Sequence, residues 1–338
     1  MFEIKLRSYT LKYNPYNSND IFSIPDPNIY YKCSEYDKST GFDYIHKIVM
    51  VTKEQPEAFD ILKEYLEKFP DKINCQNNEG WSALHLACAS PNIDNTNEKV
   101  ELLLSHPNID VNLRDGGGRS ALSYVCSCLY YSEDNSESKL ELLLKHPNIN
   151  INLQNNMGLT PLHFACLYSD EDTVESIIKI LLDHPKIDVN LQDNSGWTAL
   201  HFACCSSNKN GSERKIELLL SHPDININLQ NPMGRTALHI VCQYFNTNNA
   251  ERTLELLLTH LDINVNLQDH LGMTALHIAC ENSNTNSAER TVELLLTHSA
   301  IDVNLQDNSG EKALHLAYKY STTERTVEHL LSYLQNQH

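Results

Sequence analysis

The chain has 338 residues, of which 41% are hydrophobic, and a formal net charge of −18. This hydrophobic content excludes wholesale disorder, and the acidic excess, which lies within residues 41–338, disfavours nucleic acid and anionic membrane surfaces as partners. Because we see no secretory signal and no apolar run near the roughly 20 residues that span a bilayer, we expect ten reduced cysteines in a cytoplasmic or nuclear protein.

Residues 1–40 lie outside the repeating part of the chain. They hold six of the 16 tyrosines and the segment "SIPDPNIYYKC", whose prolines interrupt regular structure. The stretch "FEIKLRSYTLKY" favours a strand or hairpin. We therefore expect residues 1–40 to be an N-terminal cap or tail, or else a docking segment.

Residues 41–338 repeat a single unit. Glycines that precede the pattern x-[ST]-[AP]-L, or a close variant of it, recur at spacings of 38, 40, 38, 38, 38 and 38 residues, and a weaker copy begins at Gly41, 39 residues before the first of them. Such a period indicates about eight stacked units that bury their apolar faces only against one another. The glycines are Gly80, Gly118, Gly158, Gly196, Gly234, Gly272 and Gly310.

Each unit predicts two helices. In residues 272–310, Thr274 is a suitable N-cap, and "ALHIAC" gives a short apolar helix. A polar loop, "ENSNTNS", leads to a second helix, "AERTVELLLTH", and "SAIDVNLQDNSG" then runs extended into the next turn. In another copy the first helical position is Pro161, which is favoured there because its missing N–H is not needed.

This repeat resembles the ankyrin repeat. The matching residues are G-x-T-P/A-L-H-x-A, the V-x-x-L-L of the second helix and D-V-N-x-x-D-x-x-G, with the clearest copies at 158–166 and 196–204. The resemblance implies an all-α solenoid of stacked antiparallel helix pairs with β-hairpin fingers. It also implies protein–protein recognition without catalysis. The period here exceeds the family's usual length of about 33 residues, chiefly through longer Asn/Ser/Thr-rich loops between the two helices.

A histidine follows most repeat glycines by five residues and stands at the third position of the first helix. There a polar side chain can reach back to the N-cap while the cap oxygen accepts its N–H, as in a capping box. We therefore predict a structural role, which the family resemblance also implies. These residues are His46, His85, His163, His201, His239, His277 and His315.

A cysteine and a second histidine also recur once in most repeats, and both residue types can bind metals. A cysteine follows each histidine by three residues in most copies, as in Cys166 and Cys280, but units stacked about 8–10 Å apart spread such ligands out. A second histidine, such as His184 or His222, ends each second helix, where it can bond the last carbonyls or respond to pH. We predict no metal.

No catalytic motif stands out. Gly116-x-Gly118-x-x-Ala121 matches a loose dinucleotide fingerprint, but it lies in register with six finger turns that lack that pattern. We therefore predict that the chain takes no cofactor and is not an enzyme.

The positions flanking the turn glycine are the least constrained by the fold, and the resemblance places specificity at these fingertips and on the exposed side of the first helix. Here they carry aromatic, methionine and arginine side chains, which are enriched at interface centres. The candidate partner-binding residues are Trp81, Met157, Leu159, Trp197, Met233, Arg235, His270, Leu271 and Met273.

The last unit has Lys312 in place of the N-cap threonine and Tyr318 in place of the cysteine, which is typical of a C-terminal cap. We expect a monomeric adaptor, scaffold or competitor that binds a protein of unknown identity. The alternative is a substrate-recognition subunit of an enzyme complex, such as a ubiquitin ligase, docked through residues 1–40.

Overall fold

The described part of the chain contains sixteen α-helices, one short 3-10 helix and the loops that connect them. The computed structural model describes residues 41–50, 58–90, 96–127, 136–167, 172–205, 212–244, 250–282, 286–321 and 324–336. The predictions for residues 1–40 and for most of the polar loops between paired helices lie outside these ranges. The elements are α1 (Tyr44–Met50), α2 (Ala58–Lys68), η2 (Pro70–Asn74), α3 (Ala83–Ala89), α4 (Thr96–Ser105), α5 (Ala121–Ser127), α6 (Ser136–Leu144), α7 (Pro161–Leu167), α8 (Asp172–Leu182), α9 (Ala199–Cys205), α10 (Ser212–Leu220), α11 (Ala237–Gln243), α12 (Ala250–Leu258), α13 (Ala275–Glu281), α14 (Asn286–Leu296), α15 (Ala313–Tyr320) and α16 (Arg325–Asn336).

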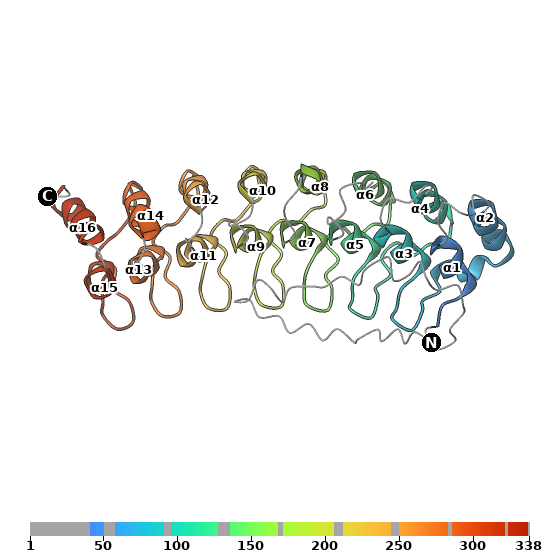
Figure 1. Ribbon diagram of the computed structural model, residues 1–338, viewed down its shortest axis with the longest axis horizontal. Helices are drawn as coiled ribbons and strands as arrows, with labels where there is room; N and C mark the ends of the chain where they lie inside the picture. The colour runs from blue at the N-terminus through green and yellow to red at the C-terminus, as the bar shows by residue number, and fades with distance from the viewer. Residues whose placement is uncertain are drawn as a thin grey trace.

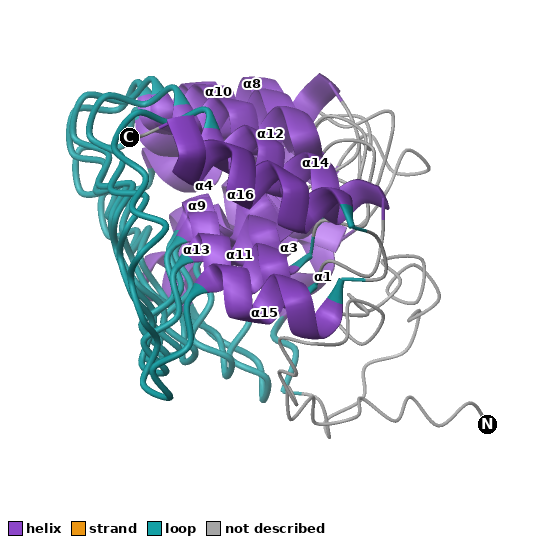
Figure 2. Ribbon diagram, turned by 90° about the vertical axis from the view of Figure 1, so that its left-hand side faces the viewer, coloured by secondary structure: helices purple, strands orange, loops and turns teal. Residues whose placement is uncertain are grey.

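The helices form two parallel rows. Odd-numbered helices pack against odd-numbered neighbours, even-numbered helices pack against even-numbered neighbours, and each odd helix also packs against the even helix that follows it (Figure 1). The loops that follow the even helices all run down one side of the stack and project beyond the odd row (Figure 2). The predicted all-α solenoid of stacked helix pairs is confirmed.

The odd helices are too short to be stable alone. α7 and α9 have seven residues each, whereas isolated helices below about 12–15 residues are marginal in water. In α7, residues Pro161–Cys166 are all buried, because the helix packs between α5 and α9. The stack therefore supplies the stability of each odd helix. None of the described helices is long and apolar enough to cross a bilayer.

The fingers are hairpin-like loops instead of regular β-hairpins. Within the described residues, antiparallel pairing is limited to isolated bridges, Gln76 with Ser82 and Gln306 with Lys312. The finger backbone bonds instead within its own turn and with the next finger: Gly234 N donates to Asn231 O at 2.8 Å, and His270 N donates to Met233 O at 2.9 Å. The family resemblance implied β-hairpins, but here turn and inter-finger bonds replace the ladder of a strand pair.

Candidate functional site

The motif histidines join each repeat to the next. The Nδ1 of His163 accepts the main-chain N–H of Thr160 at 3.0 Å and the threonine hydroxyl at 2.7 Å. Its Nε2 lies 3.0 Å from the carbonyl oxygen of Trp197 in the following repeat. Because the main-chain N–H can only donate and the carbonyl can only accept, Nδ1 is unprotonated and the neutral ring carries its proton on Nε2. Equivalent bonds to the following repeat are made by His46, His85, His201, His239 and His277.

Burial holds these rings in the neutral form. Desolvation lowers the pKa of His163 and of His201 to about 4, although hydrogen bonds to the carbonyls of Trp197 and Arg235 oppose the shift. The pKa of His46, His85, His239 and His277 is lowered for the same reason. His315 is exposed in the last repeat, and its Nδ1 accepts the main-chain N–H of Lys312. Both ring nitrogens of the six buried histidines are therefore occupied by structural bonds.

The cysteines that follow the motif histidines by three residues are buried. Burial raises the pKa of the Cys166 thiol to about 12 and also raises the pKa of Cys204, Cys242 and Cys280. A thiol held protonated is a poor nucleophile and a poor metal ligand. Over the described ranges, no group of three or more His, Cys, Asp or Glu residues is placed to hold a metal ion.

The second histidine ladder bonds differently from the expectation. The Nδ1 of His184 accepts the N–H of Lys186 at 3.2 Å, and His222 accepts from Asp224 at the same distance. We expected these rings to donate to the last helix carbonyls. The turn after the helix instead presents an N–H, for which neutral Nδ1 is the suitable acceptor.

Asparagine and glutamine side chains bind successive fingers together. Asn190 Nδ2 donates to Asp224 O at 2.6 Å, and its Oδ1 accepts from Asn226 N at 2.8 Å. Gln192 Nε2 donates to the carbonyls of Gly196 and Gln230 at 2.8 and 2.9 Å. Both bonding patterns recur along the array, so these motif side chains are engaged internally.

The residue directly after the turn glycine is buried at three of the fingers. Leu159 is 2% exposed, and Trp197 and Met273 are each 7% exposed. Trp197 packs on Phe202 with ring centroids 5.3 Å apart. Trp81 is half-buried, and its ring centroid lies 4.4 Å from that of Tyr124. Leu159, Trp197 and Met273 therefore pack within the array and offer almost no surface to a partner. Their place beside the glycine had suggested that they would contact a partner.

The residues before the glycine face outward at two adjacent fingers. Met233 is 48% exposed and Leu271 is 60% exposed, and His270 beside Leu271 is also exposed. The bond from His270 N to Met233 O holds the two fingertips together. We name Met233, His270 and Leu271 the Met233 patch. Met157, which holds the same place in an earlier finger, is only half-buried.

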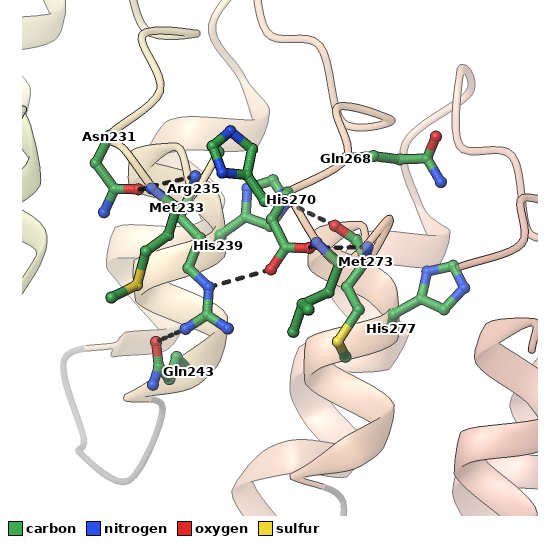
Figure 3. Close-up of polar contacts among 12 residues, drawn as sticks. Asn231, Met233, Arg235, His239, Gln243, Gln268, His270, Met273 and His277 are labelled. Atoms are coloured by element: carbon green, nitrogen blue, oxygen red, sulfur yellow. Dashed lines mark hydrogen bonds and ion pairs between the residues drawn. The ribbon is translucent and has the colours of Figure 1, made fainter. Parts of the chain in front are cut away.

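Arg235 lies beside this patch and is held by two side chains (Figure 3). Its Nε lies 3.2 Å from Asp269 Oδ2, and its Nη1 lies 2.6 Å from Gln243 Oε1 at the end of α11. The Arg235 side chain is 17% exposed, whereas that of Asp269 is 1% exposed. Asp269 Oδ1 also accepts the N–H of Leu271 and of Met273, each at 2.9 Å. One carboxylate thus fixes both the finger turn and the arginine.

The sequence analysis did not predict that Asp269 and Gln243 belong to this site. Asp269 occupies a finger position that Asn or Asp fills in every complete repeat, so its type carried no special signal. The signal was Arg235 itself, because an arginine in the place of Trp197 or Met273 needs a counter-charge and further acceptors near it.

Most of the chain matches a known protein family. A family model described as ankyrin repeats (3 copies) matches residues 48–152, 128–231, 174–269, 207–290 and 238–338. Among solved structures, the ankyrin repeat domain of Bcl-3, described as a unique member of the IkappaB protein family, superposes with a TM-score of 0.59 and 22% identity, over 75% of this chain and 100% of that chain. The ankyrin repeat protein EF0377 aligns with a TM-score of 0.48 and 22% identity, over 59% of this chain and 91% of that chain.

Proposed function

Because the chain belongs to the ankyrin-repeat family, whose members generally bind proteins, we propose that it is a non-catalytic protein-binding module that recognises its partner through the Met233 patch. It would act as an adaptor, scaffold or competitor, since each of these roles needs only a rigid surface. The alternative of an enzyme-complex subunit rests on residues 1–40, which lie outside the described ranges, and no observation favours it.

The exposure of the Met233 patch carries the proposal. Met233 and Leu271 are two of the few large hydrophobic side chains that the described residues expose, and they lie on neighbouring fingers joined by a backbone bond. Contiguous exposed apolar side chains reduce solubility and mark interaction sites in soluble proteins. A methionine side chain also adapts its shape to a partner.

The two positions before each turn glycine carry little charge, unlike the rest of the chain. The two residues before each of the seven glycines from Gly80 to Gly310 include a single formal charge, Glu79, although the chain carries a net charge of −18. Charged residues are depleted at interface centres, and a neutral edge removes the repulsion that the acidic chain would otherwise exert on an acidic partner. This distribution supports the fingers as the binding edge.

The motif residues argue for binding over chemistry. The buried repeat histidines use Nδ1 and Nε2 in bonds to their own cap and to the next repeat, as His163 does with Thr160 and Trp197. The repeat cysteines are buried with raised pKa values, as in Cys166. General acid–base or nucleophilic work needs such groups to be free and near their working pKa.

The test is affinity capture with mass spectrometry, which compares wild type with the double variant Met233→Ser, Leu271→Ser. Serine already occupies the equivalent place at Ser195 and Ser309, so the substitution is compatible with the turn. Glu79→Ser changes the same position of a distant finger and serves as the matched control. We expect the double variant, but not the control, to lose a specific protein. Retention of every captured protein by the double variant would place recognition elsewhere and refute the proposal.

A further inference from the structure

Arg235 has hydrogen-bond donors that no described residue uses. A guanidinium carries five N–H groups, and within the described residues Arg235 engages Asp269 through Nε and Gln243 through Nη1. Gln243 gives its Oε1 to Arg235, and its side-chain amide makes no other bond to a described residue. The remaining N–H groups of both side chains therefore have no acceptor among the described residues and can bond a partner.

The charge of Arg235 is already balanced. The carboxylate of Asp269 lies 3.2 Å from Nε and is 1% exposed, so water screens this pair weakly. A second carboxylate brought to Arg235 would meet the Asp269 charge as well, in an array whose net charge is already strongly negative. An uncharged acceptor would gain the hydrogen bonds without that repulsion.

The side chains next to these donors are apolar. Met233 precedes Arg235 by two residues and is 48% exposed, and Leu271 follows Asp269 by two residues and is 60% exposed. In Figure 3 the side chains of Met233 and Arg235 extend in the same direction from their finger, toward the Gln243 end of α11. A segment that covers Met233 and Leu271 with apolar side chains would therefore bring its own polar backbone close to Arg235.

We propose that Arg235 and Gln243 form a subsite for an uncharged carbonyl oxygen, from the backbone or an amide side chain of the partner, within an apolar partner segment that covers Met233 and Leu271. This inference rests on the proposed function of the Met233 patch and adds the chemistry of its partner. Asp269 is the residue that sets the selectivity, since it neutralises the arginine without exposing its own charge.

The array supplies matched substitutions for the test. Asn77, Asn155 and Asn231 hold the place of Asp269 and accept the same pair of turn N–H groups, so Asp269→Asn keeps the finger turn. Met273 holds the place of Arg235 one repeat later, so Arg235→Met suits the fold. Circular dichroism and the unfolding midpoint verify both variants before binding is measured.

The probe is a random peptide library displayed on phage and selected on wild type, Asp269→Asn, Arg235→Met and the double variant Met233→Ser, Leu271→Ser. We expect wild type to select apolar peptides without Asp or Glu. Their affinity, measured by fluorescence anisotropy with synthetic peptides, should fall at least about tenfold in Arg235→Met. Asp269→Asn uncovers the arginine charge and should shift the selected peptides toward Asp, Glu or a free C-terminal carboxylate.

The outcomes separate the two proposals. Acidic peptides selected by wild type, or equal peptide affinities in wild type and Arg235→Met, would overturn the uncharged subsite. If such peptides still required Met233 and Leu271, the proposed function would stand. Peptides that bind wild type and the serine double variant equally would contradict the proposed function, and the subsite with it.

Discussion

The Nε2–H of His163 donates to the carbonyl oxygen of Trp197 across 3.0 Å, from one repeat to the next. Both residues are buried, at 1% and 7% exposure. The same ring accepts from the N-cap of its own helix, so one imidazole stabilises a helix start and a repeat interface together. The same bond recurs from repeat to repeat along the array, which explains why a titratable residue recurs in the core.

Replacement of His163 by alanine should destabilise the protein by about 2–3 kcal/mol. The change removes a cap bond and leaves the buried carbonyl of Trp197 without its donor. Urea unfolding followed by far-UV circular dichroism measures the loss. His315→Ala is the control, because His315 is exposed and, among the described residues, its ring bonds to Lys312 alone. Its effect should stay below about 1 kcal/mol, and equal losses in the two variants would contradict the role of the inter-repeat bond.

Stability should fall as the pH drops below about 6.5. Folding lowers the pKa of His163 and His201 from the ordinary 6.5 to about 4, so between these values the unfolded chain binds protons that the folded chain does not. The stability contribution is full above pH 6.5 and is lost progressively toward pH 4. At pH 5 the free energy of unfolding should be lower by roughly 4 kcal/mol through these two residues together.

Unfolding midpoints measured at pH 7.5 and 5.5 test this titration. The double variant His163→Ser, His201→Ser is the control, since Ser123 already occupies the same helix position in another repeat and bonds to its own cap residue, Ser120. Its midpoint should depend on pH less steeply than that of wild type. A wild-type midpoint that does not change over this interval would rule out the protonation of the buried ladder.

Local patterns predicted the helix pairs and the capping box, because an N-cap and a histidine three residues later interact within one turn. The bond from His163 to Trp197 could not be predicted, since it depends on how two repeats stack. The fingertip residues show the same limit. Met233 and Arg235 flank one glycine equally in sequence, yet Met233 is exposed, whereas Arg235 is half-buried and pairs with the buried Asp269.

Gly234→Ala should destabilise more than Gly310→Ala. Both glycines have φ of +78°, where an L side chain costs roughly 1–2 kcal/mol. A Cβ on Gly234 would lie 2.7 Å from the backbone nitrogen of His270. A Cβ on Gly310 would have no described atom within 4 Å. The difference between the two unfolding free energies, expected to be about 1–3 kcal/mol, measures how tightly neighbouring fingers pack. Equal effects would mean that the fingers can separate freely.

The repeat cysteines should resist alkylation in the native protein. Burial raises the pKa of Cys166 to about 12, and Cys88, Cys126, Cys204, Cys242 and Cys280 are buried in equivalent places. Because the thiolate is the reactive form and the reagent must also reach it, both barriers act together. Iodoacetamide labelling at neutral pH with peptide mapping should leave these six unmodified, whereas denaturant should expose all of them. Cys75, which is only partly buried, is the internal comparison. Rapid native labelling of Cys166 would show that the odd helices open locally, and the rigid recognition surface inferred for this array would then be incorrect.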